Sequence, residues 1–452
     1  MFEAWPKVGA RNMNTTRSNS SITYFAAKNC RIWNWFSIAS IALVFTVHAA
    51  AGAPLPETIP EQVGLSSENL QNIDTVFEAG ISDGRIPGAV IAVARHGKLA
   101  YFKAYGMQNA TEGVPMQTDS IFRIYSMTKP IVSVGAMMLH EDAKLYLSEA
   151  AGKYLPKLTD MKVAEVGRGP GTGSNTVSIV PALTAITIHD LLRHTSGFTY
   201  GFYGQSPAKQ RLKESGLSDL NALDLPLEKF VDQLVTLPLA YQPGEHWEYG
   251  RSVDVLGHLI EVVSDENLDT FLKTGIFDPL GMIDTGFWVP EADWSRIAEP
   301  LKNTGEPELI DVRRPPELLA GGHGLVSTTS DFLRFCQMLL NGGTLDGVRI
   351  LGPKTVEYMT ANHLHDGISR TGPYYLPGPG YGFGLGFGIR EANGISPWPG
   401  SEGEYFWGGY AGTYFWVDPT EELIVVLMSQ SVIHRTHYRM VLRNLVYQAI
   451  IK

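Results

Sequence analysis

Ser126 and Lys129 form an S-x-x-K pair at the start of an apolar stretch, in the segment Arg123-Ile-Tyr-Ser-Met-Thr-Lys-Pro130. Pro130 has no backbone N–H, so it belongs in the first turn of a helix, which places Ser126 at the helix N-terminus. Residues three apart lie on one helix face, so the two side chains are neighbours. A serine needs a base to act as a nucleophile, and a lysine kept neutral by burial is such a base. The pair therefore predicts covalent acyl transfer, against the alternative of a capping serine beside a surface lysine.

Two other serine motifs are weaker candidates. Ser206 and Lys209 repeat the S-x-x-K spacing in a polar stretch with no apolar helix behind it, so we expect that copy to lie at the surface. Gly80-Ile-Ser82-Asp-Gly84 matches G-x-S-x-G. A nucleophile elbow needs a strand before its serine and a helix after it, whereas here the expected order is reversed. We therefore place Ser82 in a turn that ends a helix.

Two further segments carry groups that can assist a serine nucleophile. Tyr249 lies in a loop before a helix expected to begin near Ser252, and its phenol can pass the serine proton to a leaving group. The alternative is a tyrosine that only packs its ring. In Trp407-Gly-Gly-Tyr410 the paired glycines let the backbone approach a ligand, so an N–H there can join that of Ser126 in an oxyanion hole. The alternative is a glycine-rich bulge.

The first 53 residues differ in composition from the rest of the chain. They carry five basic residues and one acidic residue, and the apolar run IWNWFSIASIALVFTVHAAA precedes Ala51-Gly52-Ala53. This order is typical of a secretory signal, so we expect 1–53 to be a cleaved signal peptide and the protein to be periplasmic or secreted. The apolar run approaches spanning length, so an uncleaved membrane anchor is the alternative, and without it we expect no stable membrane partner.

The chain beyond this segment is acidic. Loss of five positive charges and one negative charge changes the net charge of the chain from −10 to −14. An acidic surface argues against nucleic acid as a partner. Cys336 is then the one remaining cysteine, which excludes an intramolecular disulfide and a cysteine-based zinc site. Because the histidines are scattered and no H-E-x-x-H occurs, we expect no metal, and we expect no cofactor.

The elements that must hold these groups come from both ends of the chain. We expect a helix over 65–84, two strands within 89–106, strands at 382–390, 412–418 and 423–429, and a closing helix over 437–451. The middle is predicted to be helical, with a long glycine-rich loop near 167–175. The fold class is therefore α/β of the α+β type, a five-stranded antiparallel sheet flanked by N- and C-terminal helices with an inserted helical domain. The expected domains are a signal peptide at 1–53, α/β parts at 54–125 and 316–452, and a helical domain at 126–315.

The order and context of these motifs resemble the serine β-lactamase and penicillin-recognising family, closest to class C β-lactamases and family VIII carboxylesterases. The resemblance runs from about residue 60 to the C-terminus and includes Thr187-Ile-His-Asp-Leu-Leu-Arg-His-Thr-Ser-Gly197. It implies a β-lactamase/transpeptidase-like fold in which Ser126 is the acylated nucleophile and Lys129 its base. It further implies that Tyr249 is the tyrosine of a Y-x-N motif and that the N–H groups of Ser126 and Tyr410 form the oxyanion hole.

Two positions depart from the family pattern. Arg251 replaces the asparagine of Y-x-N, and Trp407-Gly408-Gly409 replaces K-T-G, whose lysine usually pairs with a β-lactam carboxylate. Tryptophan removes that charge contact and adds an apolar wall, as in the esterase branch. The residues expected to line the substrate pocket are Tyr125, Phe198, Arg251, Trp407, Gly408 and Gly409.

These observations predict an exported serine carboxylesterase that acts on short acyl esters, with a small-molecule ester or amide as its substrate. The enzymatic alternatives are a β-lactamase or D-alanyl-D-alanine carboxypeptidase, and an acyltransferase. The non-enzymatic alternative is a β-lactam- or peptidoglycan-binding module, against which the intact Ser-Lys-Tyr set argues.

Overall fold

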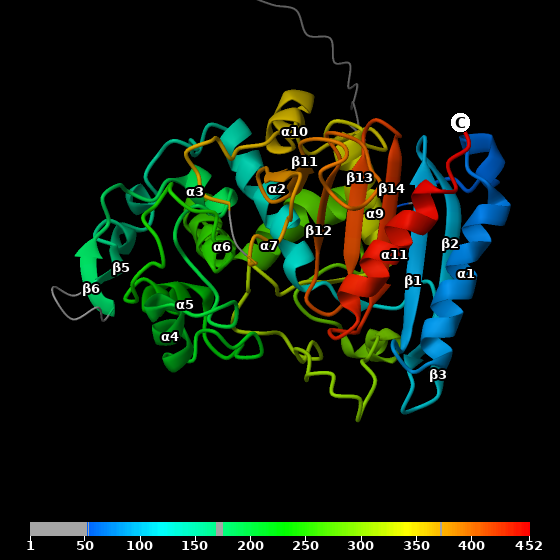
Figure 1. Cartoon of the computed structure of the whole chain (residues 1–452), viewed down its shortest axis with the longest axis horizontal. Helices are drawn as coiled ribbons and strands as arrows, with labels where there is room; N and C mark the ends of the chain where they lie inside the picture. The colour runs from blue at the N-terminus through cyan, green and yellow to red at the C-terminus, as the bar shows by residue number, and fades with distance from the viewer. Residues whose placement is uncertain (1–51, 53, 169–174, 371–372) are drawn as a thin grey trace, which may run out of the picture. The chain divides into compact units, whose positions relative to one another are not determined.

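An antiparallel sheet of eight strands organises the chain, in the order β10-β11-β12-β13-β14-β1-β2-β3 (Figure 1). The computed structural model describes residues 52, 54–168, 175–370 and 373–452. The strands of this sheet are β1 (Gly88–Arg95), β2 (Lys98–Asn109), β3 (Val114–Pro115), β10 (Tyr381–Phe383), β11 (Gly388–Arg390), β12 (Tyr405–Gly408), β13 (Tyr414–Asp418) and β14 (Leu423–Ser429).

The centre of the sheet joins the two ends of the chain, because β1 pairs with β14 from Ala89↔Ser429 to Arg95↔Leu423. Every residue of both strands is buried. Side chains alternate between the two faces of a strand, so Ile91 and Val425 enter one apolar layer while Val90 and Val426 enter the other. A sheet covered on both faces explains why these strands are continuously apolar rather than alternating.

Helices from the two termini cover one face of this sheet. They are α1 (Ser67–Ser82) and α11 (Arg435–Tyr447), which pack together (Figure 1). The side chain of Ser66 caps α1 by accepting from the Asn69 N–H, and Leu70 and Phe77 fall on its buried face at helical spacing. The opposite face is covered by α9 (Thr329–Leu340).

The segment between the ends of the chain supplies most of the remaining helices. Among these, α2 (Thr128–Glu141) packs on α6 (Ser252–Ser264), which in turn contacts α3 and α5. The others are α3 (Ile188–Leu192), α4 (Pro207–Glu214), α5 (Leu227–Leu234), α7 (Leu268–Leu272), α8 (Asp278–Leu280) and α10 (Pro353–Met359). Short strand pairs are β4 (Phe122–Arg123) with β7 (Val326–Ser327), β5 (Lys162–Arg168) with β6 (Asn175–Pro181), and β8 (Thr344–Leu345) with β9 (Val348–Arg349).

The predicted fold class is confirmed, with more strands than expected. The stretch 382–390 is not one strand, because the chain leaves the sheet between β10 and β11, where Gly386 adopts a φ of +96°. The strands β12 and β3 were not expected. The expected loop near 167–175 is bounded by β5 and β6, and its residues 169–174 lie outside the described residues.

The expected signal peptide, 1–53, also lies outside the described residues apart from Gly52. Within the part of the chain that the structure describes, no helix is both long and apolar enough to cross a membrane.

Candidate active site

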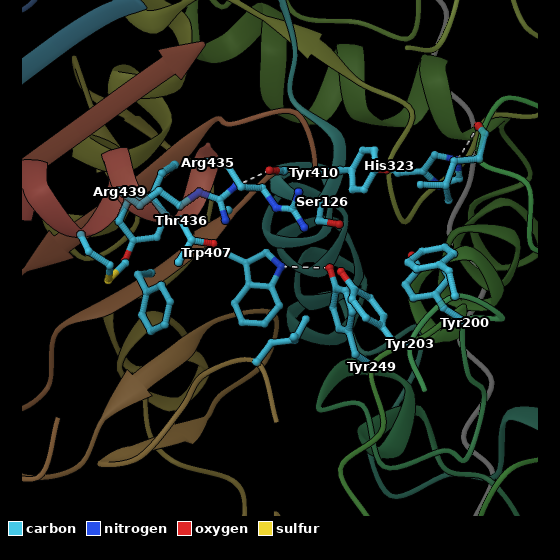
Figure 2. A pocket seen from close by; sticks show the side chains of 18 residues that line it. Ser126, Tyr200, Tyr203, Tyr249, His323, Trp407, Tyr410, Arg435, Thr436 and Arg439 are labelled. Atoms are coloured by element: carbon cyan, nitrogen blue, oxygen red, sulfur yellow. Dashed lines mark hydrogen bonds between the residues drawn. The ribbon is translucent and has the colours of Figure 1, made fainter. Parts of the chain in front are cut away.

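Ser126 lies in a short 3-10 turn, Tyr125–Met127, that runs directly into α2. Pro130 is the third residue of α2, in the first turn where its missing N–H costs no hydrogen bond. Ser126 is partly exposed although its neighbours are buried, and it lines a cavity of about 250 Å³ (Figure 2). The expected position of the serine at the start of an apolar helix is therefore observed.

The backbone immediately before Ser126 is strained. Tyr125 adopts a φ of +43°, in the left-handed region that residues with a side chain rarely occupy. Its surroundings hold it there: its hydroxyl accepts a hydrogen bond from the Ile310 N–H at 3.0 Å, and its ring meets the edge of the Tyr410 ring at 5.5 Å. Strain of this kind persists where packing over-determines it, and it fixes the direction in which Ser126 leaves the turn.

The Lys129 amine is fully enclosed and has three hydrogen-bond partners. Its Nζ lies 3.2 Å from Ser126 Oγ, 3.1 Å from the Tyr200 hydroxyl and 2.7 Å from the Gly322 carbonyl oxygen. Burial lowers the pKa of Lys129 to about 7, against an opposing effect from the charge of Asp254. A neutral amine has two N–H donors and one lone pair. With the donors on Tyr200 and Gly322, the lone pair is left for the Ser126 proton.

A buried carboxylate fixes one of these partners. Asp254 Oδ1 accepts from the Gly322 N–H at 2.9 Å, so it holds the glycine whose carbonyl binds Lys129. Asp254 Oδ2 lies 3.5 Å from Arg251 Nη1, and both side chains are completely buried. The charge of Arg251 also contributes to the lowered pKa of Lys129.

Tyr249 lies beside the serine and the lysine. Lys129 Nζ is 4.6 Å from the centre of its ring, and the Trp407 indole N–H donates to its hydroxyl at 3.1 Å (Figure 2). Burial raises the pKa of Tyr249, while a hydrogen bond with Ser126 acts in the opposite direction. The phenol therefore stays protonated at neutral pH, which suits a proton relay rather than a base.

The turn after β12 faces Ser126 across the cavity. Gly409 N–H donates to the Thr413 carbonyl at 2.9 Å, and Thr413 Oγ1 donates to the Ile124 carbonyl at 3.3 Å. Tyr410, in this turn, and Ser126 both line the same cavity. The turn is thus hydrogen-bonded to Ile124, two residues before Ser126. This arrangement suits an oxyanion hole in which the N–H groups of Ser126 and Tyr410 donate to one oxygen atom.

The cavity wall differs from the expected pocket in three residues. Trp407, Gly408 and Gly409 line the Ser126 cavity, but Tyr125 lines an adjacent cavity of about 410 Å³. Phe198 is buried in the core and does not reach either cavity. Arg251 lies behind Tyr200, with its guanidinium 5.1 Å from the Tyr200 ring and 2.7 Å from the Leu217 carbonyl, so we do not place it in contact with a substrate. The Phe, Tyr and Trp residues on the wall are Tyr200, Phe202, Tyr203, Tyr249, Phe406, Trp407, Tyr410 and Tyr414.

The two competing serine motifs lie elsewhere. Ser82 is exposed at the end of α1. Ser206 caps α4 by accepting from the Lys209 N–H at 3.2 Å. The expectation that this second S-x-x-K copy is at the surface was wrong for Lys209, which is buried because its Nζ pairs with Glu248 at 2.9 Å.

Several functional candidates were not expected from the sequence: Tyr200, Gly322, Asp254 and Arg439. Their contacts join segments far apart along the chain. The one available signal was an aspartate, Asp254, within the otherwise apolar start of the helix at Ser252, since such residues are buried only when they are bonded. In the described ranges no three His, Cys, Asp or Glu side chains are grouped as a metal site.

Comparison with known proteins agrees with this geometry. Residues 73–443 match the family model Beta-lactamase. Protein Rv1367c of Mycobacterium tuberculosis (strain ATCC 25618 / H37Rv) is 36% identical over 380 residues, which cover 80% of this chain and 89% of that protein. Esterase EstB of Burkholderia gladioli is 34% identical over 255 residues, covering 56% of this chain and 59% of EstB.

Among solved structures, "EstCE1, a hydrolase with promiscuous acyltransferase activity" is similar, with a TM-score of 0.69 and 26% identity. The likeness covers 84% of this chain and 99% of EstCE1. The chain therefore belongs to the Beta-lactamase family and is a serine hydrolase of that fold.

Proposed function

We propose that this enzyme is an exported carboxylesterase that cleaves short-chain esters through an acyl-Ser126 intermediate. The observation that carries the proposal is the enclosed Lys129 amine, 3.2 Å from Ser126 Oγ, with its other contacts on Tyr200 and Gly322. Only an amine that is neutral at working pH can take the serine proton, and a pKa near 7 meets that need.

Acylation uses the groups around Ser126 in sequence. Lys129 takes the Ser126 proton as Oγ attacks the ester carbonyl carbon. The N–H groups of Ser126 and Tyr410 donate to the oxygen that becomes negative in the tetrahedral intermediate. Tyr249 gives its proton to the leaving alkoxide and recovers a proton from Lys129, which ends the step as a neutral amine beside an acyl-serine and a free alcohol.

Deacylation runs the same path with water as the nucleophile. Tyr249 takes a proton from water as it passes its own proton to the neutral Lys129 amine, and the water oxygen attacks the acyl carbon. Collapse of the second tetrahedral intermediate returns a proton to Ser126 Oγ and releases the acid. An alcohol in place of water would give acyl transfer, so hydrolysis and transfer share every group up to this step.

The size and lining of the cavity support small acyl groups. A cavity of about 250 Å³ with an aromatic wall is slightly smaller than typical small-molecule sites, which begin at about 300 Å³. The relative EstB is named an esterase, which supports ester substrates. Export is supported by the residue order of 1–53, which matches a secretory signal.

Acyl transfer is the second candidate. EstCE1 is named for promiscuous acyltransferase activity, and the adjacent cavity shares Phe202, Tyr203, Leu220, Tyr410 and Arg435 with the Ser126 cavity. A second cavity that shares part of its wall with the first offers room for an acceptor alcohol. Product analysis with p-nitrophenyl butyrate and an added alcohol distinguishes transfer, which gives the butyrate ester of that alcohol, from hydrolysis, which gives free butyrate.

The proposal is tested with Ser126→Ala, using Ser82→Ala as the matched control. A panel of p-nitrophenyl esters should be turned over by the unmodified protein and by Ser82→Ala, and Ser206→Ala should keep nearly all activity. Ser126→Ala should lose many orders of magnitude. A fluorophosphonate should label Ser126, as read by peptide mass spectrometry. Label on another serine, or no turnover of any ester by the unmodified protein, would refute the proposal.

A further inference from the structure

Arg439 of α11 is hydrogen-bonded to the backbone of the turn that carries Tyr410. Its Nη2 donates to the carbonyl oxygens of Gly409 and of Thr413, the latter at 2.9 Å. Arg439 lines the Ser126 cavity, and Figure 2 shows it on the same wall as Trp407. The guanidinium therefore spans the two ends of the 409–413 turn from the helix side.

The two glycines of the W-G-G segment are shaped to this contact. A Cβ on Gly408 would lie 2.9 Å from Arg439 Cζ and 3.1 Å from both terminal nitrogens, so a larger residue there would displace the guanidinium from its present position. A Cβ on Gly409 would lie 2.3 Å from the Ile124 carbonyl oxygen, so only glycine lets the turn approach the segment before Ser126. In the segment that replaces K-T-G, Gly408 therefore lies against the Arg439 guanidinium and Gly409 lies against the Ile124 carbonyl oxygen.

The bond to Gly409 acts directly on Tyr410. The Gly409 carbonyl and the Tyr410 N–H belong to one peptide group, and no cis peptide occurs in the described ranges. In a trans peptide the two groups point in opposite directions, so a donor that fixes the carbonyl also fixes the N–H. A cationic donor on the carbonyl also polarises the peptide, which makes the N–H a stronger donor.

The charge of Arg439 is not offset by a carboxylate. Within the described part of the chain, its bonds go to backbone carbonyls, whereas Arg443, one turn further along α11, pairs with Glu404. Burial and the neighbouring Arg435 lower the pKa of Arg439 to about 10, so the guanidinium remains protonated at neutral pH. A positive charge thus faces the turn that would meet the negative oxygen.

We propose that Arg439 is a positioning residue for the oxyanion hole, which holds and polarises the Gly409–Tyr410 peptide so that the Tyr410 N–H meets the oxyanion. This inference rests on the proposed acylation of Ser126. It also explains how the family's lysine at position 407 can be absent, because the cation on this wall comes from α11 and acts through the backbone.

The test compares Arg439→Gln and Arg439→Lys with Arg435→Gln, which removes a charge from the same helix and the same cavity wall. Arg435 donates to the Val432 carbonyl and lies over the Tyr410 ring at 5.2 Å, without a bond to Gly409. For p-nitrophenyl butyrate, kcat is expressed per Ser126 titrated with a fluorophosphonate. A poorly folded preparation therefore still gives an interpretable value.

We expect Arg439→Gln to lower kcat by about 10- to 100-fold, below the loss for deleting a whole oxyanion donor, with KM changed less than about threefold. Arg439→Lys should fall between Arg439→Gln and the unmodified enzyme. The Ki of an alkyl boronic acid, which forms a tetrahedral adduct on serine, should rise in parallel with the loss in kcat/KM.

The proposal is overturned if Arg435→Gln loses as much kcat as Arg439→Gln, if the loss appears in KM, or if boronic acid binding does not change. In each of these three cases the unmodified enzyme would still turn over the ester. Failure of the underlying function is distinguishable, because the unmodified protein would then neither turn over the ester nor react with the phosphonate.

Discussion

The indole N–H of Trp407 donates a hydrogen bond to the Tyr249 hydroxyl at 3.1 Å, and the two rings lie 5.3 Å apart. The residue in place of the K-T-G lysine therefore still contacts the phenol beside Ser126, but as a neutral donor. A donor at this position holds one lone pair of the phenol oxygen and directs its proton elsewhere. Since Tyr249 and Ser126 line the same cavity, Trp407 sets the direction of the proposed proton relay.

Trp407→Phe should lower kcat for p-nitrophenyl butyrate by about 2- to 10-fold, the equivalent of one hydrogen bond worth about 0.5–1.5 kcal/mol. The phenyl ring retains most of the apolar wall, so KM should change little. Steady-state kinetics at a fixed pH measure both values.

The matched control for Trp407→Phe is Trp416→Phe. Trp416 is fully buried in β13, and its indole nitrogen has no hydrogen-bond partner among the described residues. Loss of its N–H should therefore cost no bond, and the change in packed volume is the same. Equal losses of kcat in the two variants would show that Trp407 acts through packing alone.

Protonation of Lys129 should lower the activity on the acid side of the pH profile. Its neutral form is the proposed base and burial lowers its pKa to about 7, so kcat/KM should fall about tenfold per pH unit below that value and level off above it. Lys129→Arg should be inactive at every pH, because a guanidinium stays protonated. A flat profile between pH 5.5 and 8, or a tenth of the activity retained in Lys129→Arg, would rule out this base.

The lowered pKa of Lys129 also predicts that this residue reduces the free energy of unfolding by an amount that depends on pH. Lysine in an unfolded chain titrates near 10.4, so between about pH 7 and that value the unfolded state binds more protons than the folded state. The contribution of Lys129 to the free energy of unfolding therefore rises with pH through this window. The stability gained by Lys129→Met should accordingly be larger at pH 7 than at pH 9, as measured by urea unfolding. An equal gain at both values would contradict the lowered pKa.

The part of the site that could be predicted from the sequence is the part set by local geometry. Ser126 and Lys129 are one helical turn apart, and Pro130 marks the start of the helix, so their relation follows from backbone dimensions. The other partners of the Lys129 amine are 71 and 193 residues away from it, at Tyr200 and Gly322. No spacing rule reaches across such distances, because those contacts depend on how α2, α6 and the loops pack.

Arg251 is a residue for which the sequence suggested a role in the pocket that the structure does not support. Its place in the motif suggested a pocket residue, yet its long side chain turns back to bond Leu217 and Asp254. The fold class followed from apolar runs at both ends of the chain. The strand count did not, since Gly386 breaks a run that looked continuous and the edge strand β3 is only two residues long. Short strands carry too few residues for an alternating pattern.

Gly409→Ala should damage catalysis more than stability. The new Cβ would lie 2.2 Å from Thr413 Oγ1 and 2.3 Å from the Ile124 carbonyl oxygen, so the turn must move away from the segment before Ser126. A displacement of about 1 Å in a site can cost about 100-fold in rate, so we expect a loss of that order in kcat. Stopped-flow acylation with p-nitrophenyl butyrate measures the affected step directly.

Gly286→Ala serves as the control for this substitution. Its Cβ would meet nothing closer than the Trp288 carbonyl oxygen at 3.8 Å, an ordinary contact. Wild-type rates are expected for it. Wild-type acylation in Gly409→Ala would mean that the turn does not position an oxyanion donor.

Substrate choice should follow the charges available to a carboxylate on the cavity wall. Trp407 carries none, Arg439 is engaged by two backbone carbonyls, and Arg435 donates to Val432 and covers Tyr410. A β-lactam carboxylate thus lacks the contact with a lysine at position 407, a charge-assisted hydrogen bond worth about 1.5–3 kcal/mol, or about 10- to 150-fold in rate. A neutral ester has no carboxylate to leave unpaired, and it gains apolar contact with Trp407 and Phe406.

We therefore expect kcat/KM for p-nitrophenyl butyrate to exceed that for a chromogenic cephalosporin by at least about tenfold. Acetate to butyrate esters should be preferred over longer acyl chains, because the aromatic wall closes a cavity of about 250 Å³. Trp407→Lys should reduce the ratio of these two kcat/KM values. It should raise kcat/KM for the cephalosporin because it restores a cation, and lower kcat/KM for the ester because it removes apolar surface. Trp407→Met, of similar length to lysine but uncharged, should weaken ester turnover without improving cephalosporin turnover. Efficient cephalosporin hydrolysis by the unmodified enzyme, with slow esters, would favour the β-lactamase alternative.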